Sequence, residues 1–197
     1  SWGVPGRGTS FPPAERLRDM GNTPGTKATV SIGLSHVAVN TADLERFRRF
    51  YEGVVGLEMG VIMRMHHPPY LRHATFHLSN AAVLHVFEVP GYDPVAQGIG
   101  TDIGKRGRID HFALMVRDET ALAEMTRRLR AAGATDGHVR QLGWLRAVHV
   151  TDPDGLQLEI SCPNPDYDPD ADRSVEDVGR ADWLRRLRAA VAGSDPP

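Results

Sequence analysis

Apolar and polar residues alternate over several short stretches in the first half of the chain, and these stretches predict β-strands. The first strand is expected over residues 33–39. A cap pair at Asn40 and Asp43 follows, and apolar residues then recur at helical spacing from Leu44 to Tyr51. This spacing predicts an amphipathic helix packed on a sheet. Further strands are expected over 58–65, 71–78 and 82–89.

The second half of the chain repeats this order of elements. A strand is expected over 109–116, and a helix that Asp118 caps and Gly133 ends follows it. Three strands, over 134–141, 145–151 and 156–161, complete the half. Each half is therefore predicted to be a β-α-β-β-β module, and the fold class to be α+β.

Similarity between the halves supports the same plan. The segment Leu-Ser-His-Val-Ala-Val at 34–39 is echoed by Ile-Asp-His-Phe-Ala-Leu at 109–114, so His36 and His111 lie 75 residues apart. His85 and Glu159, on later strands, lie 74 residues apart. Two half-domains of one plan place His36 opposite His111 and His85 opposite Glu159. Four residues with metal-ligand chemistry then occupy paired strand positions.

Glu159 is the most informative of these residues. It alternates along the strand with three aliphatic residues, which are Leu156, Leu158 and Ile160. Its side chain is therefore expected to point to the face opposite theirs. A carboxylate buried on that face is costly unless it is paired or bound to a metal ion.

Other histidines and the single cysteine fit ordinary structural roles. His66, His67 and His73 are expected in a turn and at strand edges. Cys162 is expected on the outward phase after the last strand, without a role. As the only cysteine, it excludes an intrachain disulfide and fits a reducing compartment.

The arrangement of Pro, Gly and charged residues predicts the domain organisation. One domain is expected over 31–162, in which a Gly-rich linker at 91–108 joins modules at 31–90 and 109–162. Residues 1–30 are expected to form a Pro/Gly-rich arm. Residues 163–197 are expected to form an acidic linker and a C-terminal amphipathic helix.

Composition narrows the class of partner. Charged residues make up 24% of the chain and the formal net charge is −2, which argues against nucleic acid and against a membrane surface. A small, mostly neutral molecule is the expected partner. No run of about 18 apolar residues and no signal-type segment is present, so a cytoplasmic location is expected.

The order of these motifs resembles the vicinal oxygen chelate superfamily, which includes glyoxalase I, methylmalonyl-CoA epimerase, fosfomycin-resistance proteins and extradiol dioxygenases. The resemblance covers about residues 31–162. It rests on four segments: the paired His segments above, Phe50-Tyr51 with Gly56-Leu57-Glu58, and Asp-Pro-Asp-Gly-Leu-Gln-Leu-Glu at 152–159. It implies one domain whose two modules close their sheets around a central cavity, and members commonly form homodimers.

The resemblance also implies which residues form the site. The family's metal ligands fall on His36, His111 and Glu159, with His85 as the fourth candidate ligand. One divalent ion is implied, with Fe(II) favoured and Mn, Co, Ni or Zn permitted by a ligand set of nitrogen and oxygen. His149 stands where extradiol enzymes keep a Tyr, and it is the candidate catalytic acid or base.

Three functions are compatible with this resemblance. The leading hypothesis is a single-domain extradiol-type ring-cleaving dioxygenase that acts on a substrate with vicinal oxygens. The first alternative is a lyase or isomerase of the glyoxalase or epimerase type, although glyoxalase I has a Glu where this chain has His85. The second is a protein that sequesters a small molecule without chemistry.

Overall fold

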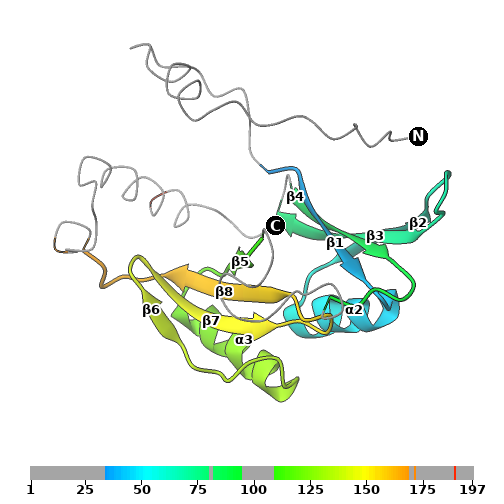
Figure 1. Cartoon of the computed structure of the whole chain (residues 1–197). Helices are drawn as coiled ribbons and strands as arrows, with labels where there is room; N and C mark the ends of the chain where they lie inside the picture. The colour runs from blue at the N-terminus through cyan, green and yellow to red at the C-terminus, as the bar shows by residue number, and fades with distance from the viewer. Residues whose placement is uncertain (1–33, 80–81, 95–108, 169–170, 172–188, 190–197) are drawn as a thin grey trace, which may run out of the picture. The chain divides into compact units, whose positions relative to one another are not determined.

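The first half of the chain forms a four-stranded mixed sheet with one short helix (Figure 1). The computed structural model describes residues 34–79, 82–94, 109–168, 171 and 189. The elements of the first module are β1 (His36–Thr41), α2 (Leu44–Phe50), the π-helical turn η1 (Tyr51–Val55), β2 (Met59–Arg64), β3 (Arg72–Ser79) and β4 (Ala82–Glu88). The strand order is β1-β4-β3-β2, with β1 parallel to β4 and the other pairs antiparallel.

The second half has the same topology. Its elements are β5 (Phe112–Met115), α3 (Glu119–Ala131), β6 (Arg140–Leu142), β7 (Leu145–Thr151) and β8 (Gln157–Pro163). The strand order is β5-β8-β7-β6, with β5 parallel to β8 and the other pairs antiparallel. The predicted α+β fold of two β-α-β-β-β modules is confirmed.

Both helices begin at an aspartate whose carboxylate accepts a hydrogen bond from a backbone N–H. Asp43 accepts from Arg46 and Asp118 accepts from Ala121, each at 2.9 Å. These bonds satisfy N–H groups that the first helical turn leaves without a partner. The first helix passes into η1 at its end and stops at Gly56, whose φ of +85° is the left-handed conformation that favours glycine.

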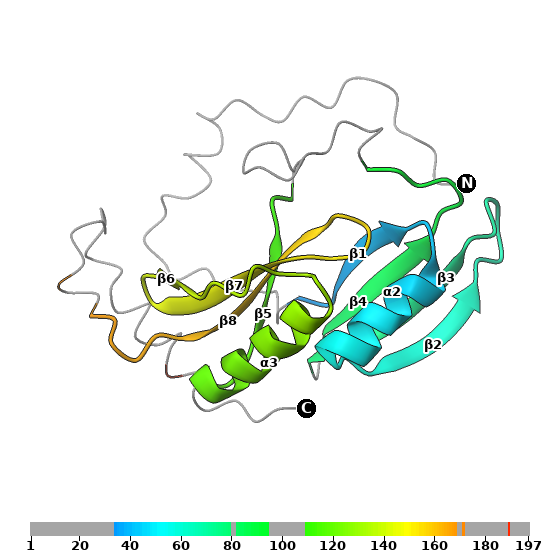
Figure 2. The ribbon, with the colours of Figure 1, turned by 90° about the horizontal axis from the view of Figure 1, so that it is seen from below.

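One hydrophobic core contains residues from both modules. In the first module it is built around aromatic rings, and Phe47 stacks on Tyr51 with ring centroids 4.2 Å apart. Phe76 of β3 packs against this pair and is fully buried. In the second module Leu122 and Leu129 of α3 join the cluster. Figure 2 shows α2 lying over the first sheet and α3 over the second.

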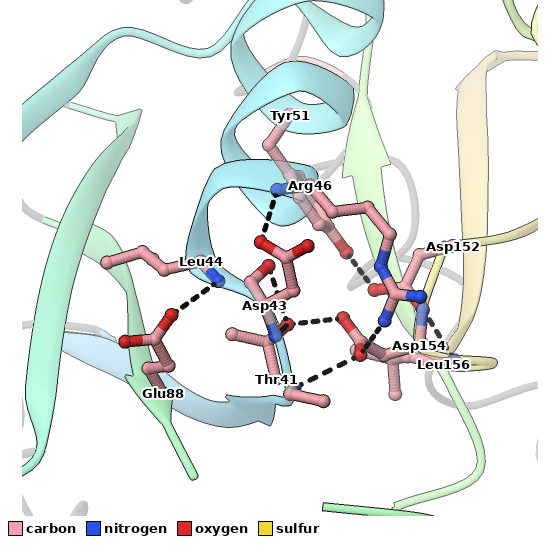
Figure 3. A network of polar contacts seen from close by, with 10 residues as sticks. Thr41, Asp43, Leu44, Arg46, Tyr51, Glu88, Asp152, Asp154 and Leu156 are labelled. Atoms are coloured by element: carbon pink, nitrogen blue, oxygen red, sulfur yellow. Dashed lines mark hydrogen bonds and ion pairs between the residues drawn. The ribbon is translucent and has the colours of Figure 1, made fainter. Parts of the chain in front are cut away.

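Polar contacts also join the modules, at the turn between β7 and β8 (Figure 3). Asp154 in this turn accepts a hydrogen bond from Thr41 at 2.7 Å and forms an ion pair with Arg46 at 2.6 Å. The side chain of Asp154 is only 4% exposed. The turn of the second module is therefore held against the start of α2 in the first.

Two sequence-based expectations about the second module are wrong. The strand expected over 134–141 is only β6, because Thr135 and Asp136 hydrogen-bond the backbone of a loop that precedes it. Cys162 does not point outward: β8 continues to Pro163, so alternation places Cys162 with Ile160 in the core, where it is fully buried.

The predicted arm at 1–30 lies outside the described residues, as do most of the predicted linker at 91–108 and all but residue 189 of the C-terminal helix predicted over 175–192. None of the described helices is long and apolar enough to cross a membrane.

Candidate functional site

The first pair of candidate ligands lies on the neighbouring parallel strands β1 and β4. Ala38 is the register partner of His85, and His36 precedes Ala38 by two residues on the same strand. Because side chains alternate along a strand, His36 and His85 share one face of the sheet. Their ring centroids are 6.2 Å apart. On β4 the buried Leu84 and Val86 face the core, so the two histidines lie on the opposite face.

The second pair has the same register. Ala113 of β5 is the partner of Glu159 of β8, and His111 precedes Ala113 by two residues. The Nε2 of His111 lies 3.9 Å from Oε2 of Glu159. The internal repeat predicted from the sequence is therefore present at the level of individual strand partners: His111 corresponds to His36, and Glu159 to His85.

Glu159 is a buried carboxylate beside two half-exposed imidazoles. The residue is 5% exposed, whereas the side chains of His111 and His149 are each 40% exposed. His149 is the register partner of Glu159 on β7, and its Nε2 lies 3.8 Å from Oε2 of Glu159. Both separations exceed the length of a direct hydrogen bond. Two imidazoles and one carboxylate thus gather on one face of the second sheet.

His36, at the start of β1, and His111, just before β5, are the two first-strand histidines. The residue before each of them contacts its Nδ1 atom. The Nδ1 of His111 lies 2.7 Å from Oδ2 of Asp110, and the Nδ1 of His36 lies 3.0 Å from Oγ of Ser35. Metal-binding histidines usually have one ring nitrogen held by such an outer partner, which leaves the other for the metal. Sequence reasoning did not single out Ser35 and Asp110, although both occupy equivalent positions of the repeated segment.

His73 is a residue whose position the sequence did not predict correctly. It lies in β3 between β2 and β4, neither in a turn nor at a sheet edge. Its Nδ1 is 2.7 Å from Nε2 of His85, and its ring stacks on Phe87 with centroids 5.5 Å apart. Burial, then the nearby His73 and His36, lower the pKa of His85. His66 and His67 lie in the turn between β2 and β3, as expected.

The donor set fits a divalent ion in its chemistry. Three imidazoles and one carboxylate, without thiolate, suit Fe(II), Mn(II), Co(II), Ni(II) or Zn(II). Outer partners hold the two first-strand histidines, and Glu159 is buried, as a ligand carboxylate would be. Among the residues that the structure describes, no group of three His, Cys, Asp or Glu side chains is close enough to hold a metal ion. The convergence of the two pairs on one ion stays a prediction.

Comparison with known proteins agrees with the architecture. A crystal structure of a glyoxylase/bleomycin resistance protein/dioxygenase domain from Frankia sp. EAN1pec is 25% identical, with TM-score 0.55, over 67% of this chain and 98% of that one. A glyoxalase/dioxygenase from Nostoc punctiforme is 19% identical, with TM-score 0.52, over 68% of this chain and 92% of that one. A glyoxalase family protein from Enterococcus faecalis is 19% identical, with TM-score 0.53, over 66% of this chain and 97% of that one.

No match was found among curated protein sequences. The sequence model of the Glyoxalase/Bleomycin resistance protein/Dioxygenase superfamily matches residues 33–160. That range begins before β1 and ends within β8, so it spans both modules. The chain therefore belongs to the Glyoxalase/Bleomycin resistance protein/Dioxygenase superfamily.

Proposed function

We propose that the protein is a divalent-metal-dependent enzyme that acts on a small substrate with two vicinal oxygens. The observation that carries this proposal is the buried carboxylate of Glu159 with the Nε2 atoms of His111 and His149 at 3.9 and 3.8 Å. A buried carboxylate without a hydrogen-bonded cation is costly, and a metal ion would offset that cost. His36, His111 and Glu159 would hold the ion, which would supply Lewis acidity and open positions for the substrate oxygens.

The reaction class that we favour is extradiol-type ring cleavage with Fe(II). Two histidines and one carboxylate are the ligand set of many non-haem iron oxygenases, and they leave positions open for substrate and dioxygen. The 2.7 Å contact between His73 and His85 supports this choice, because it engages the Nε2 of His85. His85 then lies outside the ligand set and leaves a coordination position open.

His149 is the residue that we assign to proton transfer. It lies on β7 directly across from Glu159, so it would stand beside a substrate bound at the three ligands. An imidazole exchanges protons near neutral pH, and in its neutral form Nε2 can accept the proton of a substrate hydroxyl. Its side chain is 40% exposed, which leaves it accessible to a substrate.

A lyase or isomerase of the glyoxalase or epimerase type is the second candidate. The hydrogen-bonded pair of His73 and His85 is also compatible with this alternative, because the pair lies beside His36 and offers an imidazole to move a proton. Under this alternative the substrate loses and regains a proton, and no oxygen is consumed. Simple sequestration of a ligand would require neither the buried carboxylate nor the held histidines.

The proposal is tested by metal content first and by turnover second. Protein purified without chelator and reconstituted anaerobically with Fe(II) should bind up to one ion per chain, and Glu159→Gln should abolish this binding. Glu124→Gln is the matched control, because Glu124 is a half-exposed carboxylate on α3 that pairs with Arg127. Metal binding that survives in Glu159→Gln would refute the ligand assignment.

Turnover then separates the candidate reactions. The Fe(II) protein is given a panel of catechols while oxygen uptake and the yellow ring-cleavage product are recorded. The same protein, loaded with Ni(II) or Zn(II), is given the hemithioacetal of methylglyoxal. Oxygen uptake with a catechol supports the dioxygenase, whereas hemithioacetal turnover without oxygen uptake supports the lyase or isomerase. Tight ligand binding without either reaction would support sequestration.

A further inference from the structure

His73 of β3 lies beside the two candidate ligands of the first sheet. It is the register partner of Phe87, whereas Thr75 is the partner of His85, so His73 and His85 are diagonal neighbours on one face of the sheet. That face also carries His36. The Nδ1 of His73 lies 2.7 Å from Nε2 of His85, so one of these two nitrogens donates a hydrogen bond to the other. His73 therefore engages the tip of the His85 side chain.

Phe87 holds both imidazoles in this arrangement. The ring of His73 stacks on that of Phe87, with centroids 5.5 Å apart and an angle of 28° between the planes. The ring centroid of His85 lies 4.4 Å from that of Phe87 and 4.8 Å from that of His73. Three rings in mutual contact restrict one another's rotation, so packing supports the hydrogen bond between the two imidazoles.

The contact at His85 is the reverse of those at the other two histidines. Outer partners contact Nδ1 of His36 and of His111, which leaves Nε2 of each ring for a metal ion. At His85 the partner contacts Nε2 instead. Whether that nitrogen donates or accepts the hydrogen bond, it has no lone pair left for a metal ion. The tip of His85 thus presents no free ligand atom.

The second module lacks an equivalent of this contact. Ala147 of β7 pairs with Ser161, two residues beyond Glu159 on β8. This is the position that His73 has relative to His85 in the first module. An alanine cannot hold the side chain of Glu159, whose Oε2 lies instead near two imidazoles at 3.8 and 3.9 Å. The two modules therefore differ at the one position that controls the tip of the last-strand residue.

We propose that His73 is a positioning residue that withholds Nε2 of His85 from the metal ion and so keeps one more coordination position open for the substrate. The proposal rests on the proposed function, because it takes a divalent ion held by His36, His111 and Glu159 as its starting point. In this role His73 contacts neither the ion nor the substrate. Without its imidazole, the tip of His85 is free to turn toward His36, whose ring centroid is 6.2 Å away, and to add a fourth protein ligand.

The test counts ligated histidines in the full chain loaded with Co(II). Beside this paramagnetic ion, the ring N–H of a ligated imidazole gives a proton NMR signal far outside the ordinary range, and the signal disappears in heavy water. His73→Phe keeps a ring against Phe87 but lacks Nδ1, so it should show one such signal more than the wild type. His85→Gln should remove one signal in the His73→Phe background and none in the wild-type background. Both backgrounds should bind up to one ion per chain.

Three further variants separate the hydrogen bond from a general effect on β3. His73→Asn places an amide near the position of Nδ1, so it should keep the wild-type number of signals. His77→Phe makes the same substitution on the same strand, where the side chain is 55% exposed, and it should add no signal. His73→Leu is a second truncation and should match His73→Phe, with circular dichroism used to confirm the fold of each variant.

The outcomes distinguish this role from the ligand assignment. A signal lost on His85→Gln in the wild-type background would make His85 a ligand already, and it would overturn the role of His73 while leaving the other three ligands in place. An unchanged number of signals in folded His73→Phe and His73→Leu would overturn it as well. If the wild type showed no shifted ring N–H signal, the proposed ligand set would be refuted, and the role of His73 with it.

Discussion

The phenol of Tyr51 donates a hydrogen bond of 3.0 Å to Oδ2 of Asp152, although 101 residues separate them. Tyr51 follows α2 in the first module, and Asp152 begins the turn between β7 and β8 in the second (Figure 3). The other carboxylate oxygen of Asp152 accepts from the N–H groups of Asp154 and Leu156, each at 2.8 Å. One buried carboxylate therefore shapes its own turn and joins the modules.

Removal of the phenol should weaken this connection. Tyr51→Phe keeps the ring in the aromatic core but leaves Oδ2 of Asp152 without its only hydrogen-bonded side-chain donor in the described region. The expected loss is about 1–3 kcal/mol in the free energy of unfolding, measured by urea denaturation. Tyr70→Phe is the control, because Tyr70 is 52% exposed and should change stability little. Equal effects of the two substitutions would contradict the assigned role of Tyr51.

The pH dependence of stability should carry a signature of Asp152. Burial raises the pKa of this carboxyl from 3.8 to about 6, against the opposing hydrogen bonds from Leu156 and Tyr51. Because the folded pKa is above the unfolded one, the stabilising contribution is fully present below about pH 4 and is lost as the pH rises through about 6. The loss at neutral pH is on the order of 3 kcal/mol.

Asp152→Asn cannot ionise and should not show this loss. Urea denaturation of both proteins between pH 4 and 7 should give a difference in unfolding free energy that moves in favour of the variant as the pH rises. A difference that stays constant over this range would show that Asp152 does not titrate with the raised pKa.

The aromatic core beneath α2 should be the most sensitive part of the first module. Phe76→Ala leaves a cavity against Phe47 and Tyr51, whose ring centroids lie 5.6 and 6.1 Å from that of Phe76. Truncation of a fully buried Phe costs about 3–5 kcal/mol, which urea denaturation would detect. Phe76→Leu should cost less because it fills more of the space. Similar losses for the two variants would show that packing volume is not what matters there.

His73 should control the titration of His85. The nearby His73 is one cause of the lowered pKa of His85, after burial. His73→Gln removes a group that becomes positively charged, so the pKa of His85 should rise toward its ordinary value. Imidazole resonances of metal-free protein, followed by NMR from pH 5 to 8, would measure this. His67→Gln, in the turn between β2 and β3, is the control and should not move the titration of His85.

His149 should affect turnover without affecting metal content. His149→Gln removes the proposed acid or base but none of the three proposed ligands, so the protein should bind as much metal as the wild type. The expected loss in kcat is about 10²- to 10⁴-fold, measured on whichever substrate the wild type turns over. Loss of metal in this variant would instead make His149 a ligand.

The architecture and the two pairs of candidate ligands could be predicted from the sequence, because both depend on local periodicity. Alternation along the strand predicted the face on which Glu159 lies. The 75- and 74-residue offsets predicted that His111 is equivalent to His36 and Glu159 to His85. The register confirms this equivalence, because Ala38 pairs with His85 as Ala113 pairs with Glu159. These patterns report which side of its own strand a residue occupies. They do not report which residue lies next to it on another strand.

Neighbours across strands were decided only by the tertiary structure. His73 meets His85 because β3 pairs with β4 in a register that contains an irregularity between His77 and Ser79, and no local pattern encodes that shift. Tyr51 meets Asp152 because the two modules share one core, which brings the end of α2 to the turn before β8. The sequence alone determined the order of strands and helices and the face of Glu159, but not the extent of β6 or the face of Cys162. Contacts between distant segments depend on how the faces of these elements pack.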